Sequence, residues 1–336
     1  MSLATQNCVP HCVRFVLQPL FLVTFPHMIA VVFPGQGSQK PGMGKNLYDS
    51  RPEARSVYER VTGATGVDVA AVCFSLDEDE LRQTQNAQLA LYVCGVAAFA
   101  CLQSHLRGVV EVDAFAGHSV GEYAALVASD VLSVEDGARL VQRRGEIMAQ
   151  AGHQQPGTMA AVLGLDRDAL QAVCDSVDGI VVIANDNCPG QLVISGEVAA
   201  VNAAGEAAAA AGAKRVLPLS VSGAFHSPLM NESATQMRVA LDAAQFKAGG
   251  RVFANVTAQP VVQEGRWPEL LERQLKSPVR WTETIQNMRN EGIDTFIECG
   301  VGDVLCGLIR RTDKESKCLK VNDLDTLEAA VAAVRA

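Results

Sequence analysis

The chain has 336 residues, of which 49% are hydrophobic and 19% are charged, a balance typical of one large or two ordinary globular domains. Its net charge of −9 at pH 7 argues against a nucleic-acid-binding protein, because such a protein presents a basic face to its ligand. Only 5% of the residues are aromatic, which leaves few side chains on which single-stranded bases could stack.

The ten cysteines lie mostly in apolar segments and include no C-x-x-C pair. A zinc ribbon and a thioredoxin-like redox site both need such a pair, so neither is indicated. Thiols in apolar segments behave as small core residues, and this usage fits a reducing compartment. We therefore expect a cytoplasmic protein without a metal site.

The first 27 residues contain an apolar run, 15-FVLQPLFLVTFP-26, that a glutamine and two prolines interrupt. The run has no evident A-x-A cleavage site, which argues against a secretory signal. It is also too short and too rich in proline for a membrane span. A regular strand pattern starts only at Met28. We expect residues 1–27 to be a disordered or artefactual extension.

From Met28 to about residue 150, strand-like and helix-like segments alternate. A strand at 29–33 leads into a glycine-rich loop, and a second strand at 109–115 leads into an alanine-rich helix. Further helices are expected at about 47–62, 86–104 and 133–150. This alternation predicts a parallel, doubly wound α/β sheet.

The glycine-rich loop 34-PGQGSQKPGMGK-45 fits neither common nucleotide-binding pattern. The pattern G-x-x-x-x-G-K-[ST] would need glycine at 39 and serine or threonine at 46, where the chain has Gln39 and Asn46. No G-x-G-x-x-G is present either. The loop is therefore either a flexible turn or the lining of a site at the carboxyl end of the first strand.

The stretch 116-AGHSVGEYAAL-126 places Ser119 between two glycines where a strand becomes a helix. The pattern G-x-S-x-G is typical of a nucleophile elbow, in which a tight turn exposes the serine hydroxyl. The same turn would put the N–H of Val120 at a helix start, where it could stabilise an oxyanion. The alternative is a serine that only caps the helix.

Two consecutive arginines follow in 138-ARLVQRRGEIMAQAG-152. Arg143 and Arg144 point about 100° apart on a helix, so one can be solvated while the other faces a cleft. A buried arginine there could bind a carboxylate through two parallel hydrogen bonds. The alternative is that both arginines are solvated.

Residues 153–222 follow a different order of elements. Strands are expected at 157–165, 179–185, 191–196 and 214–221, with helices at 166–177 and 197–212. Asp166 is the expected N-cap of the first helix, and Gly212 ends the second. The order β-α-β-β-α-β is typical of a ferredoxin-like unit.

A nucleophilic serine needs a base, and His226 is the favoured one of the six histidines. It lies in 222-SGAFHSPLM-230, a turn at the boundary of the ferredoxin-like unit, where it could face a cleft. His118 adjoins the serine and would diverge from it, so we expect it to shape the site. No acid is evident, so a carbonyl could orient the imidazole. The early histidine also differs from the order of α/β-hydrolases.

After residue 222 the alternating pattern resumes. Helices are expected near 229–246, 267–276, 281–291 and 303–312, strands at 251–256 and 294–299, and a final strand and helix within 318–336. We therefore predict a large α/β domain made of residues 28–152 and 223–336, with a small domain at 153–222 inserted into it.

Seven motifs in order give the chain a family resemblance. They are FPGQGSQ (33–39), GHSVGEYAAL (117–126), QRRGEIM (142–148), NDNCPGQLVISG (185–196), GAFHSPLM (223–230), RQLKSPVRW (273–281) and ECGVGDVLCGLIRR (298–311). The chain resembles the malonyl-CoA:acyl carrier protein transacylases of type II fatty acid synthesis and, more broadly, the acyltransferase domains of polyketide and fatty acid synthases. The resemblance implies a hydrolase-like α/β domain that carries a ferredoxin-like insertion.

The resemblance also implies roles for matching residues. Ser119 would be the nucleophile and His226 the base, while Arg144 would bind the free carboxylate of malonyl. The backbone N–H groups of Gln36 and Val120 would form the oxyanion hole.

Four further residues would complete this site. The main-chain carbonyl of Gln274 would orient His226, Asn187 and His118 would line or shape the cleft, and the bulk of Phe225 would leave little room for a branched acyl group. No metal or bound cofactor is implied, and malonyl-CoA is a substrate.

The implied reaction is a ping-pong transfer of malonyl from malonyl-CoA, through a malonyl-serine, to the phosphopantetheine thiol of acyl carrier protein. Carrier proteins are usually acidic, so docking to this acidic chain would need a local basic patch, for which Lys214 and Arg215 are candidates. We expect a monomer with no nucleic-acid or membrane partner.

Three other functions remain open at this point. A trans-acting polyketide acyltransferase would use the same chemistry with a different carrier or extender unit. A serine esterase or thioesterase would have no need for Arg144. A non-enzymatic scaffold would have no need for Ser119 and His226.

Overall fold

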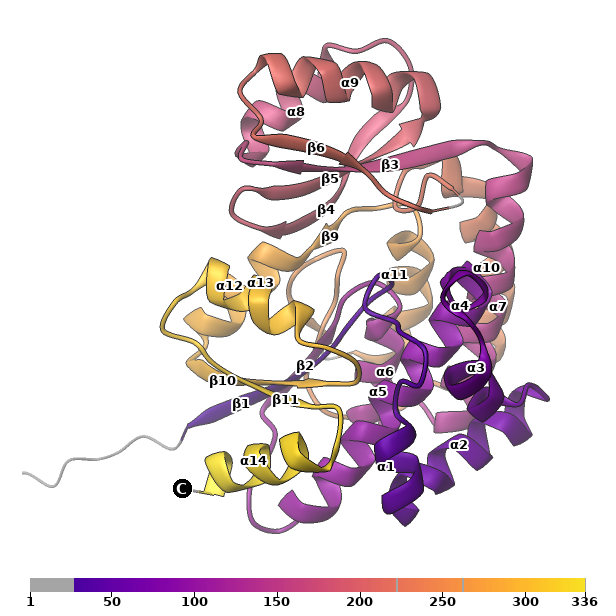
Figure 1. Ribbon diagram of the computed structural model, residues 1–336, viewed down its shortest axis with the longest axis vertical. Helices are drawn as coiled ribbons and strands as arrows, with labels where there is room; N and C mark the ends of the chain where they lie inside the picture. The colour runs from indigo at the N-terminus through magenta and orange to yellow at the C-terminus, as the bar shows by residue number, and fades with distance from the viewer. Residues whose placement is uncertain (1–26, 222, 262, 336) are drawn as a thin grey trace, which may run out of the picture.

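The computed structural model describes residues 27–221, 223–261 and 263–335. The prediction of an extension over residues 1–27 therefore falls almost entirely outside the described residues. The described chain is a mixed α/β fold built on two sheets (Figure 1).

The first sheet has the strand order β11-β10-β1-β2-β7-β8. Five of these strands run parallel and β8 is antiparallel to β7, which confirms the predicted parallel sheet. Their bounds are β1 (Met28–Phe33), β2 (Ala114–Gly117), β7 (Val252–Phe253), β8 (Pro260–Val261), β10 (Ile293–Cys299) and β11 (Lys317–Val321).

Alternate residues of β1 enter two different cores, because successive side chains of a strand point to opposite faces. Val31 and Phe33 pack in the core formed with α2 (Pro52–Thr65), α5 (Thr84–Leu106), α6 (Gly121–Ala128) and α7 (Val134–Gln154). Val32 packs in the core formed with α12 (Trp281–Asn290) and α13 (Val304–Thr312). Helices therefore cover both faces, as a parallel sheet requires.

Helix α5 is apolar on all sides because it runs through the larger core. It is long and apolar enough to cross a membrane by composition, but 78% of its most apolar window is buried inside the protein. Its apolar character is thus explained by packing against the sheet and its neighbouring helices.

The second sheet has the order β6-β3-β5-β4-β9 and stands above the first in Figure 1. Its strands are β3 (Gly157–Leu163), β4 (Val181–Cys188), β5 (Gln191–Glu197), β6 (Arg215–Pro218) and β9 (Val279–Arg280). Helices α8 (Arg167–Asp175) and α9 (Val198–Ala210) share a core with this sheet. As predicted, the Asp166 side chain caps α8, accepting the N–H of Ala169 at 2.8 Å.

Strand β9 comes from outside the range 153–222, yet it pairs in parallel with β4. It lies between α11 (Trp267–Gln274) and α12 in the sequence. This strand was not predicted, because two residues are too few to show any periodicity. The second sheet is therefore completed by the C-terminal part of the chain.

Three predicted elements differ in the structure. The strand expected at 109–115 begins only at Ala114, since Val109 is exposed and the Asp113 side chain instead accepts the N–H of Ile29. The helix expected at 47–62 is divided into α1 (Lys45–Ser50) and α2, because a proline at 52 forces Arg51 into an extended conformation. The strand expected at 251–256 stops after Phe253, where a turn begins.

The remaining elements are short helices and the C-terminal region. They are α3 (Val69–Ser75), α4 (Glu78–Arg82), α10 (Asn231–Ala243), α14 (Leu324–Arg335) and the 3₁₀ turns Pro228–Met230 and Glu264–Arg266.

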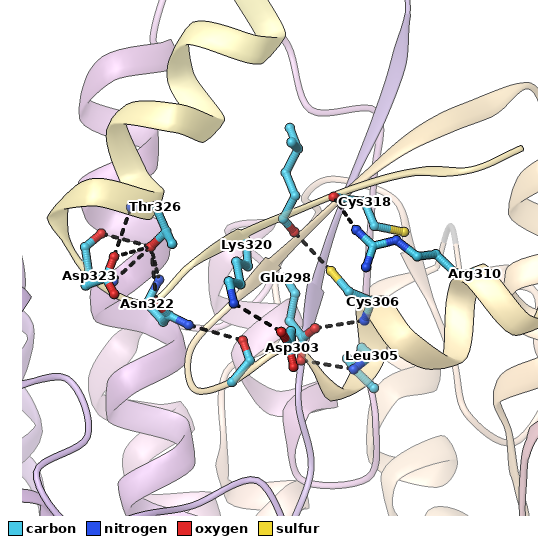
Figure 2. A network of polar contacts seen from close by, with 12 residues as sticks. Glu298, Asp303, Leu305, Cys306, Arg310, Cys318, Lys320, Asn322, Asp323 and Thr326 are labelled. Atoms are coloured by element: carbon cyan, nitrogen blue, oxygen red, sulfur yellow. Dashed lines mark hydrogen bonds and ion pairs between the residues drawn. The ribbon is translucent and has the colours of Figure 1, made fainter. Parts of the chain in front are cut away.

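A polar network fixes the end of β10 to the start of α13 (Figure 2). The buried carboxylate of Glu298 accepts the backbone N–H groups of Leu305 at 3.1 Å and Cys306 at 2.8 Å. Lys320 on β11 pairs with Asp303 at 3.1 Å in the same loop. The carboxylate thus satisfies two donors of a helix start that have no partner within the helix.

Candidate active site

The turn that carries Ser119 closes only because glycines flank it. A Cβ on Gly117 would lie 1.9 Å from the carbonyl carbon of Gly121, and a Cβ on Gly121 would lie 2.2 Å from the carbonyl oxygen of Phe33. Ser119 itself has a φ of 52°, in the left-handed region that residues with a Cβ rarely occupy. Its side chain does not cap α6, so the alternative of a capping serine is wrong.

The Ser119 hydroxyl lies 2.8 Å from Nε2 of His226, and Nδ1 of His226 lies 2.7 Å from the main-chain oxygen of Gln274. A carbonyl can only accept, so Nδ1 carries the proton and Nε2 is free to accept one from Ser119. Burial, and then the charge of Arg144, lower the pKa of His226 to about 3. The imidazole is therefore neutral at ordinary pH, as a general base must be.

Arg144 is 1% exposed, whereas Arg143 is solvated and pairs with Glu146. Nη2 of Arg144 donates to the Ser119 hydroxyl at 3.0 Å and to Oε1 of Gln274 at 2.9 Å. Nη1 of Arg144 donates to Oε1 of Gln88 at 2.6 Å. Burial lowers the pKa of Arg144. Among the described residues no carboxylate forms an ion pair with this buried guanidinium, which can therefore receive a carboxylate from a ligand.

A cavity of about 320 Å³ opens in front of Ser119. Gln36, Val120, Arg144, Phe225 and His226 line it together with the serine. In the part of the chain that the structure covers, the backbone N–H groups of Gln36 and Val120 have no hydrogen-bond partner. Two such donors beside a nucleophile can hold a developing oxyanion.

His118 and Asn187 lie on the side of the cavity that faces the second sheet. Nε2 of His118 lies 2.8 Å from Oδ1 of Asn187, and burial lowers the pKa of His118. His118 lines the cavity, and of the two asparagines in β4, Asn185 lines it and Asn187 does not. Asn187 therefore reaches the cavity only through its contact with His118, which differs from the expectation that it lines the cleft.

Besides Asn185, three buried polar residues around this cavity were not predicted from the sequence: Gln88, Glu122 and Asn255. Oδ1 of Asn255 accepts the N–H of Ser119 at 2.8 Å, and its Nδ2 donates to the main-chain oxygen of Gly117 at 2.7 Å. A polar residue just after a parallel strand could have signalled Asn255. A single charged residue in an otherwise apolar helix could have signalled Glu122. Gln88 follows other polar residues at the start of α5 and had no such signal.

Comparisons with known proteins agree with this geometry. The acyl transferase domain family matches residues 30–332. The malonyl CoA-acyl carrier protein transacylase of Bacillus subtilis (strain 168) is 42% identical over 307 residues, which are 90% of this chain and 96% of that protein.

Two solved structures are similar over nearly the same length. The acyl-carrier-protein S-malonyltransferase of Bartonella henselae is 40% identical, covers 92% of this chain and 100% of its own, and superposes with a TM-score of 0.87. A malonyl-transacylase in complex with its type II PKS acyl-carrier protein is 37% identical, covers 91% and 99%, and has a TM-score of 0.87. The chain therefore belongs to the acyl transferase family, among the malonyl-CoA:acyl carrier protein transacylases.

Proposed function

We propose that this chain transfers the malonyl group from malonyl-CoA to acyl carrier protein in fatty acid biosynthesis, through a malonyl ester of Ser119. The observation that carries the choice of a malonyl group is the position of Arg144. Within the described part of the chain the hydrogen-bond partners of this buried cation are all neutral, and it contacts the nucleophilic hydroxyl at 3.0 Å. An acyl group with a free carboxylate can pair with it, and an acetyl group cannot.

In the first half-reaction His226 takes the proton of Ser119 as the hydroxyl oxygen attacks the malonyl thioester. The N–H groups of Gln36 and Val120 hold the oxyanion until coenzyme A leaves as the thiol, with the proton from His226. In the second half-reaction the carrier-protein thiol gives its proton to His226 and attacks the ester carbonyl. The bond to the Ser119 oxygen then breaks, and His226 returns the proton to that oxygen. Gln274 supports both steps, because its carbonyl lies 2.7 Å from the imidazole.

The proposed reaction needs no metal ion and no bound cofactor. The chain supplies the nucleophile, the base and the oxyanion donors, and the reacting thioester arrives with malonyl-CoA. Phe225 is buried and lines the cavity, so we assign it the exclusion of branched acyl groups.

We also propose that residues 153–222 are a ferredoxin-like unit inserted into a hydrolase-like domain of residues 28–152 and 223–336. The order β6-β3-β5-β4 supports this, with antiparallel neighbours and two helices sharing one core. Met159 and Val221 of the insert line the same cavity as Ser119, so the active site would lie where the two units meet.

Lys214 and Arg215 remain our candidates for docking the carrier protein. Both are exposed at the start of β6, and the chain that continues this strand lines the cavity from Leu219 to Val221. Leu219 lies four residues after Arg215, which corresponds to about 13 Å along an extended chain. A flexible phosphopantetheine arm could span that distance. We further propose that the protein acts as a cytoplasmic monomer.

The test is an intact-mass measurement after mixing the protein with malonyl-CoA or acetyl-CoA, without carrier protein. We expect one malonyl adduct per chain and a much weaker acetyl adduct. The malonyl adduct should disappear when holo acyl carrier protein is added. Steady release of free malonate without an adduct would instead indicate a hydrolase, which is the esterase alternative.

A carrier of type II polyketide synthesis is the second candidate acceptor, because one similar structure is a complex with such a carrier. The two acceptors are separated by offering the malonyl-enzyme a fatty-acid carrier and a polyketide carrier at equal concentration. Faster transfer to the fatty-acid carrier is expected.

A further inference from the structure

Glu122 is a buried carboxylate that the proposed reaction does not use. It is 1% exposed and lies in the first turn of α6, three residues after Ser119. Its Oε1 accepts the backbone N–H of Asn255 at 2.8 Å, and its Oε2 accepts a hydrogen bond from Nε2 of Gln274. Within the described ranges it forms no ion pair. A buried charge without a contacting cation is costly to fold, so its presence needs an explanation.

The two partners of Glu122 hold different parts of the active site. Asn255 holds the serine turn through the Ser119 N–H. Gln274 holds three groups at once: its carbonyl contacts His226, its Nε2 donates to the main-chain oxygen of Ser119 at 2.9 Å, and its Oε1 accepts from Arg144. Glu122 therefore accepts hydrogen bonds from two residues with different roles: Asn255, which holds the backbone of Ser119, and Gln274, which accepts from Arg144.

We propose that Glu122, as a carboxylate, is a positioning residue that fixes the orientation of the Gln274 amide and thereby aims Arg144 at the malonyl group. This inference rests on the proposed function. An amide side chain has one acceptor atom and one donor atom. Both groups that face its Nε2 are acceptors, and Arg144, which faces its Oε1, is only a donor.

A neutral side chain at position 122 would disturb this arrangement. Protonated Glu122, or a glutamine, must direct at least one donor toward Asn255 N–H or Gln274 Nε2, which are donors themselves. Rotating the Gln274 amide by 180° relieves the conflict at position 122, but its Oε1 then faces the Ser119 carbonyl, another acceptor, and its NH₂ group faces Arg144. The guanidinium loses an acceptor and moves away from the position that pairs with the malonyl carboxylate.

The protonation of Glu122 falls within the working range of pH. Burial raises the pKa of Glu122 to about 7, although the bonds from Asn255 and Gln274 and the charge of Arg144 oppose this. The charged or titratable groups that act on it are Arg144 on α7 and Tyr123 on its own helix. His226, in the loop after β6, is joined to it through Gln274. The neighbours α5, β1 and β2 add no charge that acts on it. The low pKa of His226 keeps the base neutral above pH 5.

The experiment measures the rate of acyl-enzyme formation by quenched-flow intact mass, from pH 5.5 to 8.5, with malonyl-CoA and with acetyl-CoA. Wild-type protein is compared with Glu122→Gln, Glu122→Asp and Glu298→Gln. In Glu122→Gln we expect malonyl loading to fall on the order of 10- to 100-fold at pH 8, as for a misplaced binding group. Acetyl loading should fall several-fold less, because it does not use the carboxylate contact.

The pH profile gives the readout that a merely structural role would not change. The rate of wild-type malonyl loading should decrease as the pH falls through about 7, as Glu122 takes up a proton. This decrease is the acidic limb of the pH profile. This acidic limb should be absent in Glu122→Gln and partly restored in Glu122→Asp, which keeps the charge. Should the glutamine variant not fold, the aspartate variant still tests the proposal, because its acidic limb should be displaced from that of the wild type.

Glu298→Gln is the matched control, since Glu298 is an equally buried carboxylate that accepts two hydrogen bonds elsewhere. It should keep the wild-type acidic limb and the wild-type ratio of malonyl to acetyl loading. The proposal is overturned if Glu122→Gln keeps both as well. Failure of the proposed function is a separate result, because the wild-type protein would then form no malonyl adduct at any pH.

Discussion

Glu122 and Glu298 are two buried carboxylates that are alike in exposure, in the number of hydrogen bonds they accept and in the direction of their pKa shift. Each is 1% exposed, each accepts two hydrogen bonds, and burial raises the pKa of each. The difference lies in the donors. Both donors to Glu298 are backbone N–H groups at the start of α13, whose positions the helix fixes (Figure 2). One donor to Glu122 is the side chain of Gln274, which also contacts Ser119 and Arg144.

Burial and a shifted pKa therefore do not distinguish a functional carboxylate from a structural one in this protein. A perturbed group is only a candidate for a site, because structural networks perturb pKa values too. What distinguishes the two is whether the next group along the network can change its orientation and whether it contacts a reacting atom. Variants at the active site should therefore change acyl loading and its selectivity, and variants at Glu298 should change stability.

The largest effect is expected at the nucleophile. Ser119→Ala removes the atom that carries the acyl group, so acyl-enzyme formation should fall by about 10⁴-fold or more. Intact mass after incubation with malonyl-CoA measures it, and circular dichroism checks that the variant is folded. A malonyl adduct of normal yield in this variant would place the nucleophile elsewhere.

Arg144→Ala should separate the two substrates by at least about 100-fold. Two charge-assisted hydrogen bonds to the malonyl carboxylate are lost, each worth roughly 1.5–3 kcal/mol, while acetyl loading loses neither. The ratio of kcat/KM for malonyl-CoA to that for acetyl-CoA is the measurement. Arg143→Ala is the control, because its side chain is solvated, and it should leave the ratio unchanged. Equal losses for both substrates would refute a carboxylate contact.

Glu298→Ala should change stability and leave selectivity alone. It leaves two backbone N–H groups at the start of α13 without an acceptor, at a cost of roughly 2–4 kcal/mol in the free energy of unfolding. Urea unfolding measures the loss. The folded enzyme should retain its ratio of malonyl to acetyl loading, and a changed ratio would show that the two regions are coupled.

The pH dependence of stability should reveal the ionisation of Glu122. Its folded pKa of about 7 lies above the ordinary value of 4.5, so its contribution to stability is present below 4.5 and is lost as the pH rises through 7. Between pH 5 and 7 the wild type should therefore lose about 1 kcal/mol per pH unit relative to Glu122→Gln. Parallel unfolding curves across this range would mean that Glu122 does not titrate there.

The smallest effect concerns the backbone at position 119. Ser119→Gly and Ser119→Ala both lack the hydroxyl, but only glycine adopts a φ of 52° without strain. Relief of the backbone strain is worth roughly 1–2 kcal/mol. This exceeds the roughly 0.5–1 kcal/mol by which the greater chain entropy of glycine stabilises the unfolded state. Ser119→Gly should be more stable than Ser119→Ala by about 0.5–1 kcal/mol in urea unfolding. The opposite order would indicate that the turn is unstrained.

The sequence allowed the parallel sheet to be predicted, because strands such as β1 and β10 are long enough to show apolar runs between helices. It also singled out the serine turn, His226 and Arg144, which lie in distinctive local patterns. It did not reveal β9, nor Asn255 and Glu122. Asn255 is 136 residues from Ser119, and their hydrogen bond depends on tertiary packing that no local pattern encodes.

The left-handed backbone at Ser119 also occurs at His226, whose φ is 58°. Backbone strain alone would favour glycine at both positions, and a glycine at either position would be chemically inert. Natural selection for activity and natural selection for stability thus act in opposite directions at these two positions. In homologues that no longer need the enzymatic activity, substitution by glycine is expected at these two positions. Glycine at position 119 or 226 would therefore identify an inactive homologue from sequence alone.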